Sequence, residues 1–160
     1  MSNKIIKSYI SQLKSLYESD NWLDECYLKK IEKVSERQAF CKPFQYLHSI
    51  AEILSHVLEW RIVLAKRFKN SKEQVFKLSL DQNWKDNEQL KNKGWIQLCN
   101  EFKDSQEQLL VVLEPQDDEF LKSIWKESYS YEYLLEGLIH HDAYHLGQIG
   151  LIYRLVNQSI

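Results

Sequence analysis

The sequence predicts an all-α protein, and three observations point to this fold class. Gly and Pro are scarce, with four and two residues among 160, so the chain is poor in the residues that form tight turns. Hydrophobic residues make up 44% and charged residues 28%, which is typical of a globular domain that can bury its own core. Apolar side chains recur at steps of three and four residues, the period of an amphipathic helix. We therefore expect a four-helix bundle with at least one long connection, forming a single domain over residues 1–160.

The first long helix is expected over about residues 3–18, where isoleucine and leucine side chains follow the helical period. A second, shorter helical piece is expected over residues 22–34. Residues 35–38 have the pattern of a capping box, in which side chains bond the free backbone N–H groups of a first turn. This pattern predicts a single turn of helix before the next connection.

Ser49 and Glu52 repeat the capping-box pattern and mark the beginning of the second long helix. Its apolar stripe continues to about Phe68, where we expect the helix to end. Residues 70–88 are polar and predict a connection, and Trp84 within them is expected to hold that connection on the bundle.

The third long helix is expected over residues 88–113, weakened at Gly94 by roughly 1 kcal/mol relative to Ala. A short amphipathic piece is predicted over residues 120–126. Ser130 is a good N-cap for the last long helix, because its hydroxyl can accept a free backbone N–H. That helix is expected to end near Val156, which completes the four.

Charge and cysteine content exclude several classes of function. The net charge is -2 and the pI is about 6.2, so no basic surplus is present to bind a nucleic acid backbone. Cys26, Cys41 and Cys99 lack the spacing of a zinc knuckle or a disulfide framework and read as thiols in a reducing compartment. No stretch approaches the roughly 18 apolar residues of a membrane span or the profile of a signal peptide. We therefore expect a cytoplasmic protein with no nucleic acid or membrane partner.

The last helix carries the most informative pattern, because His141 and His145 lie one turn apart on its apolar stripe. Two imidazoles at this spacing can reach one metal ion from the same helix face. The alternative is a pair of core histidines bonded to nearby carbonyl or carboxyl groups. The HExxH pattern of zinc proteases is absent, since Asp142 follows His141 and no Glu lies between the histidines.

A third histidine, His56, lies beside the apolar stripe of the second long helix and therefore at a seam between helices. Considered alone, it reads as a histidine bonded to a neighbouring helix. A bundle can bring it against His141 and His145, and three neutral imidazoles leave at least one coordination position open. Such a set suits zinc, nickel, iron or copper.

Two segments carry a resemblance to a known family: SIAEILSHVLEWR at residues 49–61 and HDAYHLGQI at residues 141–149. They resemble the DinB-like superfamily of metal-dependent proteins, which includes the YfiT-like proteins. The resemblance extends from the LYESDNW segment to Tyr153. It implies a four-helix bundle, often a homodimer, with a divalent ion such as Zn, Ni or Fe.

By this resemblance the metal ligands are His56, His141 and His145, whereas His48 and His140 match no ligand position. Relatives with known activity transfer low-molecular-weight thiols or isomerise with a thiol cofactor.

Three further residues are expected at the site or beside it. Asp142 points about 100° away from His141 around the helix, so direct ligation is disfavoured. It could orient a ligand or form a salt bridge with Arg61 that locks two helices together. Gln148 follows the same stripe one turn after His145, where it could line the pocket or bond a backbone group.

The resulting hypothesis is a metal-dependent enzyme that acts on a small molecule, such as a low-molecular-weight thiol, by thiol transfer or hydrolysis. No residue is placed as a general base, so the catalytic residues are left unassigned. The alternatives are a non-catalytic module that binds a metal or small ligand, and a bundle whose site has lost its metal. Three glycines in the last helix, together with many large aromatic residues, predict an apolar outer patch. With the resemblance, this patch predicts a homodimer.

Overall fold

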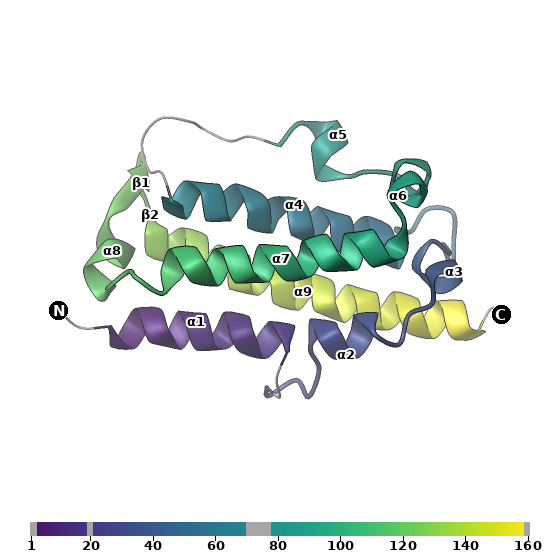
Figure 1. Cartoon of the computed structure of the whole chain (residues 1–160), viewed down its shortest axis with the longest axis horizontal. Coiled ribbons are helices and arrows are strands. Elements are labelled where there is room, and N and C mark those ends of the chain that lie inside the picture. Colours follow the sequence, from purple (N-terminus) through teal and green to yellow (C-terminus); the bar gives the residue numbers. More distant parts are fainter. Residues whose placement is uncertain (1–2, 19–20, 70–77, 159–160) are drawn as a thin grey trace.

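The computed structural model of the chain describes residues 3–18, 21–69 and 78–158. As predicted, the fold is an all-α bundle, and four long helices lie side by side along its long axis (Figure 1). These helices are α1 (Lys4–Tyr17), α4 (Ile50–Lys69), α7 (Trp95–Leu113) and α9 (Tyr131–Gln158). The shorter elements are α2 (Tyr27–Ile31), α3 (Glu36–Ala39), α5 (Leu80–Asn83), α6 (Asn87–Lys93), α8 (Asp118–Lys122), β1 (Ile124–Lys126) and β2 (Tyr129–Ser130).

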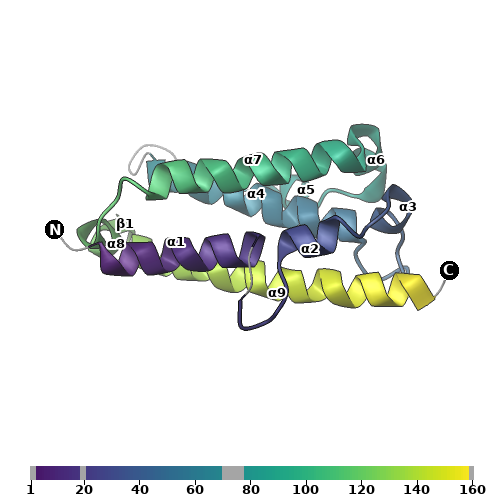
Figure 2. The ribbon, with the colours of Figure 1, turned by 60° about the horizontal axis from the view of Figure 1, so that its bottom comes forward.

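Each long helix packs against two others, which encloses one core. Helix α4 contacts α7 and α9, and α1 also contacts α7 and α9 (Figure 2). The stripes read from the sequence are buried: Ile6, Ile10 and Leu13 of α1 are at most 8% exposed. Burying each such side chain contributes about 1.5–3 kcal/mol, so packing of these stripes can stabilise the bundle without a bound ligand.

The predicted caps are present at the helix starts that matter for the site. The backbone N–H of Glu52 donates to the Ser49 hydroxyl (3.1 Å), and the N–H of Ser49 donates to the Glu52 carboxylate (3.0 Å). The capping box at Ser35 begins α3. The Ser130 hydroxyl accepts the N–H of Tyr133 (3.1 Å) at the start of α9. The sequence therefore sets where α4 and α9, the two helices of the site, begin.

Three local expectations were wrong. The piece expected over residues 22–34 is reduced to α2, because Trp22 is 99% exposed and Asp24 has a φ of 52°. The third helix is divided into α6 and α7 at Gly94, whose φ of 88° lies in a region that side chains with a Cβ rarely adopt. The end of the stretch expected as helix over residues 120–126 is instead strand β1, which pairs antiparallel with β2. Such a short run is ambiguous between the two periods.

Candidate metal centre

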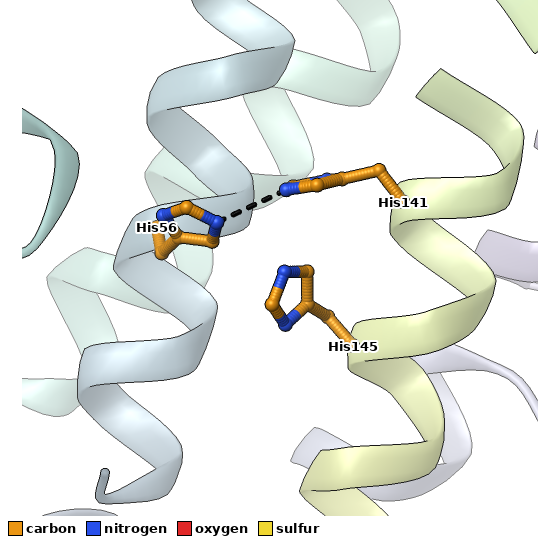
Figure 3. A group of neighbouring side chains, drawn as sticks. All are labelled: His56, His141 and His145. Carbon is orange, nitrogen blue, oxygen red and sulfur yellow. Dashed lines mark hydrogen bonds between the residues drawn. The ribbon is translucent and has the colours of Figure 1, made fainter. Parts of the chain in front are cut away.

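Three imidazoles from two antiparallel helices converge on one point (Figure 3). His56 comes from α4, and His141 and His145 come from α9. The Nε2 atoms of His56 and His141 are 3.0 Å apart. One ring nitrogen from each of the three histidines lies within 4.8 Å of the other two. This is the scale on which ligands share one metal ion, since Zn–N bonds are about 2.0–2.1 Å long.

The helices position these side chains through ordinary packing. His141 and His145 are one turn apart on the side of α9 that faces α4, and His56 faces them across the seam. His56 is 6% exposed and His145 is 5% exposed, whereas His141 is partly exposed. The cluster is therefore shielded within the bundle and open to solvent on the His141 side.

Two of the three imidazoles are oriented by oxygen atoms at their Nδ1 positions. Nδ1 of His56 lies 2.9 Å from the backbone carbonyl oxygen of Asn83. Nδ1 of His145 lies 2.6 Å from Oε1 of Gln148. Each oxygen accepts a hydrogen from Nδ1, which assigns the tautomer and leaves a lone pair on Nε2. The Nε2 atoms of His56 and His145 thus carry lone pairs on the inner side of the cluster, and Gln148 contacts the His145 side chain rather than a backbone group.

The third imidazole lies beside a carboxylate. Nδ1 of His141 is 3.7 Å from Oδ1 of Asp142, and both atoms are buried without a hydrogen-bond partner. If the His141 ring carries its only hydrogen on Nε2 and donates it to Nε2 of His56, then Nδ1 of His141 is an acceptor. It then faces another acceptor, Oδ1 of Asp142. A cation bound at Nε2 would leave the ring hydrogen on Nδ1, where the Asp142 carboxylate would attract it. The donor set therefore fits a metal ion.

Asp142 forms a salt bridge to Arg61, one of the two alternatives considered for it, and both side chains are 0% exposed. Nε and Nη2 of Arg61 lie 2.9 Å and 2.7 Å from Oδ2 of Asp142. Nη1 of Arg61 donates to Oε1 of Gln106 on α7 (3.0 Å), and its guanidinium lies 4.4 Å from the ring centroid of Phe102. The Tyr27 hydroxyl donates to the backbone oxygen of Asp142 (2.8 Å). This buried cluster joins α2, α4, α7 and α9 directly behind the histidines.

The residues around the cluster include several that the sequence did not reveal as site residues. The Trp84 ring stacks on His56 (centroids 3.9 Å apart, 5° between planes) and, on its other side, on His48 (3.9 Å, 9°). The Trp60 indole N–H donates to the Asn83 side chain (3.0 Å). Trp84 was expected only to hold the connection on the bundle. Its contact with His56 depends on how the connection folds back over α4, and no periodic pattern in the sequence encodes that path.

Burial tunes the protonation of the cluster. Burial, with a smaller contribution from His141, lowers the pKa of His145 to about 4. Burial also lowers the pKa of His56. Both imidazoles are therefore neutral near pH 7, which is the form that binds metals.

The remaining histidines and the thiols lie elsewhere. His140 is exposed, and Nδ1 of His48 lies 3.3 Å from a carboxylate oxygen of Glu52. Cys26, Cys41 and Cys99 are unpaired, and burial raises the pKa of the Cys99 thiol to about 12. Among residues 3–18, 21–69 and 78–158, His56, His141 and His145 are the group of histidine, cysteine and acidic side chains close enough to share an ion.

A cavity of about 510 Å³ adjoins the cluster between α4 and α9 and gives a small molecule room beside it. Its lining residues are Trp60, Leu64, Arg67, Tyr133, Leu134, Glu136, Gly137, Leu138, His140 and His141. His141 thus belongs to both the cluster and the cavity wall. Across the described parts of the chain, no helix combines the length and the apolar composition needed to cross a bilayer.

A family model described as the DinB superfamily matches residues 25–149, a span that contains His56, His141 and His145. No curated protein and no solved structure matched the chain.

Proposed function

The chain belongs to the DinB superfamily, and from this membership and its site geometry we propose a divalent-metal-dependent enzyme that acts on a small molecule. The observation that carries the proposal is the convergence of one nitrogen each from His56, His141 and His145. Three imidazole ligands from the protein, with a further position open, are the arrangement of catalytic rather than structural metal sites.

Neutral imidazoles suit zinc, nickel and iron among the divalent ions. A bound ion of this kind lowers the pKa of water or of a thiol and so supplies a nucleophile at neutral pH. Thiol transfer and hydrolysis are two reactions that use such a nucleophile, and a low-molecular-weight thiol is the proposed substrate class. The unpaired thiols of the chain support a reducing, cytoplasmic setting.

The chain's own residues prepare the site for this chemistry. Asn83 and Gln148 hold the rings of His56 and His145 with Nε2 facing inward, and Asp142 attracts a hydrogen on Nδ1 of His141. Such outer partners commonly contribute 10–100-fold to metal affinity or activity. The cavity beside His141 offers space for a substrate next to the open position.

Metal analysis of the purified, metal-loaded protein tests the proposal. We expect one divalent ion per chain, retained in His140→Ala and lost in His141→Ala, because His140 is exposed and outside the cluster. Consumption of small thiols with an electrophile, or of small esters and amides, then tests turnover. Metal binding without turnover would support a non-catalytic binding module, and absence of stoichiometric metal in the wild type would refute the site.

We further propose that the protein is a homodimer formed through the exposed face of α9. Exposed residues at alternating steps of four and three form a straight stripe along this helix: Tyr133, Gly137, His140, Tyr144, Gly147 and Leu151. A Cβ added at Gly137 or Gly147 would meet no atom within 4 Å. Glycine within a helix is destabilising by about 1 kcal/mol relative to Ala, and contacts within the chain do not explain these two.

The stripe is complementary to itself. When two copies of α9 pair antiparallel about a two-fold axis beside position 142, Gly137 lies opposite Gly147 and His140 lies opposite Tyr144. Two glycines facing each other allow close approach of the helices, and the aromatic and apolar residues flank them. An isologous pairing of this kind uses the same patch on both copies and would bury about 1,200–2,000 Å².

A further inference from the structure

The cavity beside His141 has apolar walls along most of its length. Helix α4 contributes Trp60, Leu64 and Arg67, which are spaced by four and three residues and so share one face. Helix α9 contributes Leu134 and Leu138 from the facing stripe. Apolar walls with a few polar groups are the usual character of sites for small organic ligands.

A positive charge lies at one end of this cavity. The half-buried guanidinium of Arg67 is stacked over the Trp125 ring, 4.6 Å from its centroid, and lies 6.0 Å from the Trp60 centroid. This stacking holds the guanidinium plane in position, and two N–H groups of a guanidinium can bond both oxygens of one carboxylate. The acidic lining residue, Glu136, is exposed at the rim, where its carboxylate accepts the hydroxyl of Tyr9 (2.8 Å).

The Arg67 guanidinium and the histidine cluster border the same cavity, since Arg67 and His141 both line it. The Trp60 ring is the link between them, because its centroid lies 6.1 Å from that of His141 and 6.0 Å from the guanidinium of Arg67. Arg67 follows Trp60 by seven positions along α4, a rise of about 10 Å. A ligand with one end at Arg67 and the other at His141 therefore extends along the Trp60 ring, which lies about 6 Å from each of the two groups.

We propose that this cavity binds a small carboxylic acid with an apolar body, its carboxylate at Arg67 and its hydrocarbon along Trp60, Leu64 and Leu138. The site thereby selects the substrate class of the enzyme. The ligand's orientation, with its reactive end at His141, rests on the proposed function. The binding itself does not require the metal, because the walls and the charge belong to the protein.

Binding of octanoate and of octanamide to the metal-free protein, measured by calorimetry, tests the proposal directly. The two probes match in length and differ in charge, so we expect octanoate to bind about tenfold or more tighter. Arg67→Met should remove this preference, since it keeps an apolar side chain and deletes the charge. The matched control is Lys66→Met, which deletes an exposed positive charge one residue away that does not line the cavity.

A second pair of variants tests the cavity without altering charge. Gly137 lines the cavity, and a Cβ added there would meet no atom within 4 Å. A leucine side chain in Gly137→Leu should therefore fill part of the cavity and abolish octanoate binding. Gly147→Leu is the control, because Gly147 lies on the same helix face with equal space and outside this cavity. Tyr133, Gly137 and His140 belong both to the cavity wall and to the exposed stripe of α9. Because Gly147→Leu alters the same stripe outside the cavity, a loss of octanoate binding in Gly137→Leu alone is assigned to the cavity.

The outcomes separate this inference from the proposed function. Equal affinity for octanoate and octanamide, no binding of either, or a preference that survives Arg67→Met would overturn the carboxylate site. If octanoate binds as expected while the histidines take up no metal, the proposed function fails and the carboxylate site stands. With metal loaded, 8-mercaptooctanoate should bind more tightly than octanoate, and equal binding would overturn the orientation toward His141.

Discussion

Replacing Arg61 by Met should destabilise the protein strongly, because it leaves the carboxylate of Asp142 buried without its cation. Both side chains are 0% exposed and are joined by contacts of 2.9 Å and 2.7 Å. Removing one partner of a buried ion pair costs about 3–5 kcal/mol. For a chain of this size each kcal/mol lowers Tm by about 2–4 °C, so the expected fall is roughly 6–20 °C.

Replacing both partners should restore much of that loss. In Arg61→Met combined with Asp142→Leu no buried charge remains, and apolar replacements of a buried pair are often neutral or stabilising. The surroundings favour this result, because Phe102 lies against the guanidinium (4.4 Å from its centroid) and would equally contact a Met side chain. The bond from the Tyr27 hydroxyl uses the backbone oxygen of residue 142 and survives the double replacement.

Urea unfolding of the metal-free protein, followed by circular dichroism, measures Arg61→Met, Asp142→Leu and the double variant, and gives the coupling between the two sites. Lys14→Met is the control, since it breaks the ion pair between Lys14 and Glu114, whose side chains are 41% and 55% exposed. Exposed pairs contribute little, so its midpoint should match that of the wild type. A loss below about 1 kcal/mol for Arg61→Met would refute the assignment of this pair as the fixed contact behind the site.

Three further predictions concern the histidines and the assembly. His141→Ala should lose the metal yet keep the circular dichroism of the wild type, because apolar packing stabilises the bundle; an unfolded variant would make the site structural. The metal-free protein should lose on the order of 2–3 kcal/mol of stability as pH falls from about 6.5 to 4. In this range the His145 imidazole is protonated in the unfolded chain but stays neutral in the folded protein, where its pKa is about 4. Urea midpoints across this range should show that slope, and His145→Gln should flatten it. Light scattering should give twice the 19.2 kDa of one chain, and Tyr144→Glu should return the single mass; a wild-type monomer would reject the proposed interface.

The helical elements could be predicted where local chemistry decides them. Ser49 and Ser130 accept backbone N–H groups at the starts of α4 and α9, and a side-chain cap can be read from neighbouring residues. Gly94 was read as a weak point within one helix, whereas its positive φ ends α6 and begins α7. The helix propensity of glycine predicts a less stable helix. It does not predict whether the helix continues through Gly94 or ends there.

The site was predictable to the extent that it lies on helix faces. The spacing of His141 and His145 places both on one side of α9 by geometry alone. The contacts of His56 with the Asn83 carbonyl and the Trp84 ring could not be predicted from the sequence. Both residues lie in the connection after α4, and the contacts depend on how this connection folds back over the helix. That path has no periodicity.

The hydrogen bonds of the cluster couple metal binding to the tautomer of His141. His56 donates from Nδ1 to the carbonyl of Asn83, so its Nε2 carries a lone pair that faces Nε2 of His141 at 3.0 Å. A hydrogen between these atoms leaves Nδ1 of His141 without one, directly opposite the unsatisfied Oδ1 of Asp142. A metal ion bound at Nε2 would resolve this conflict, because the ring hydrogen would then lie at Nδ1, opposite Oδ1 of Asp142. The salt bridge from Arg61 holds the Asp142 carboxylate in this position beside the ring.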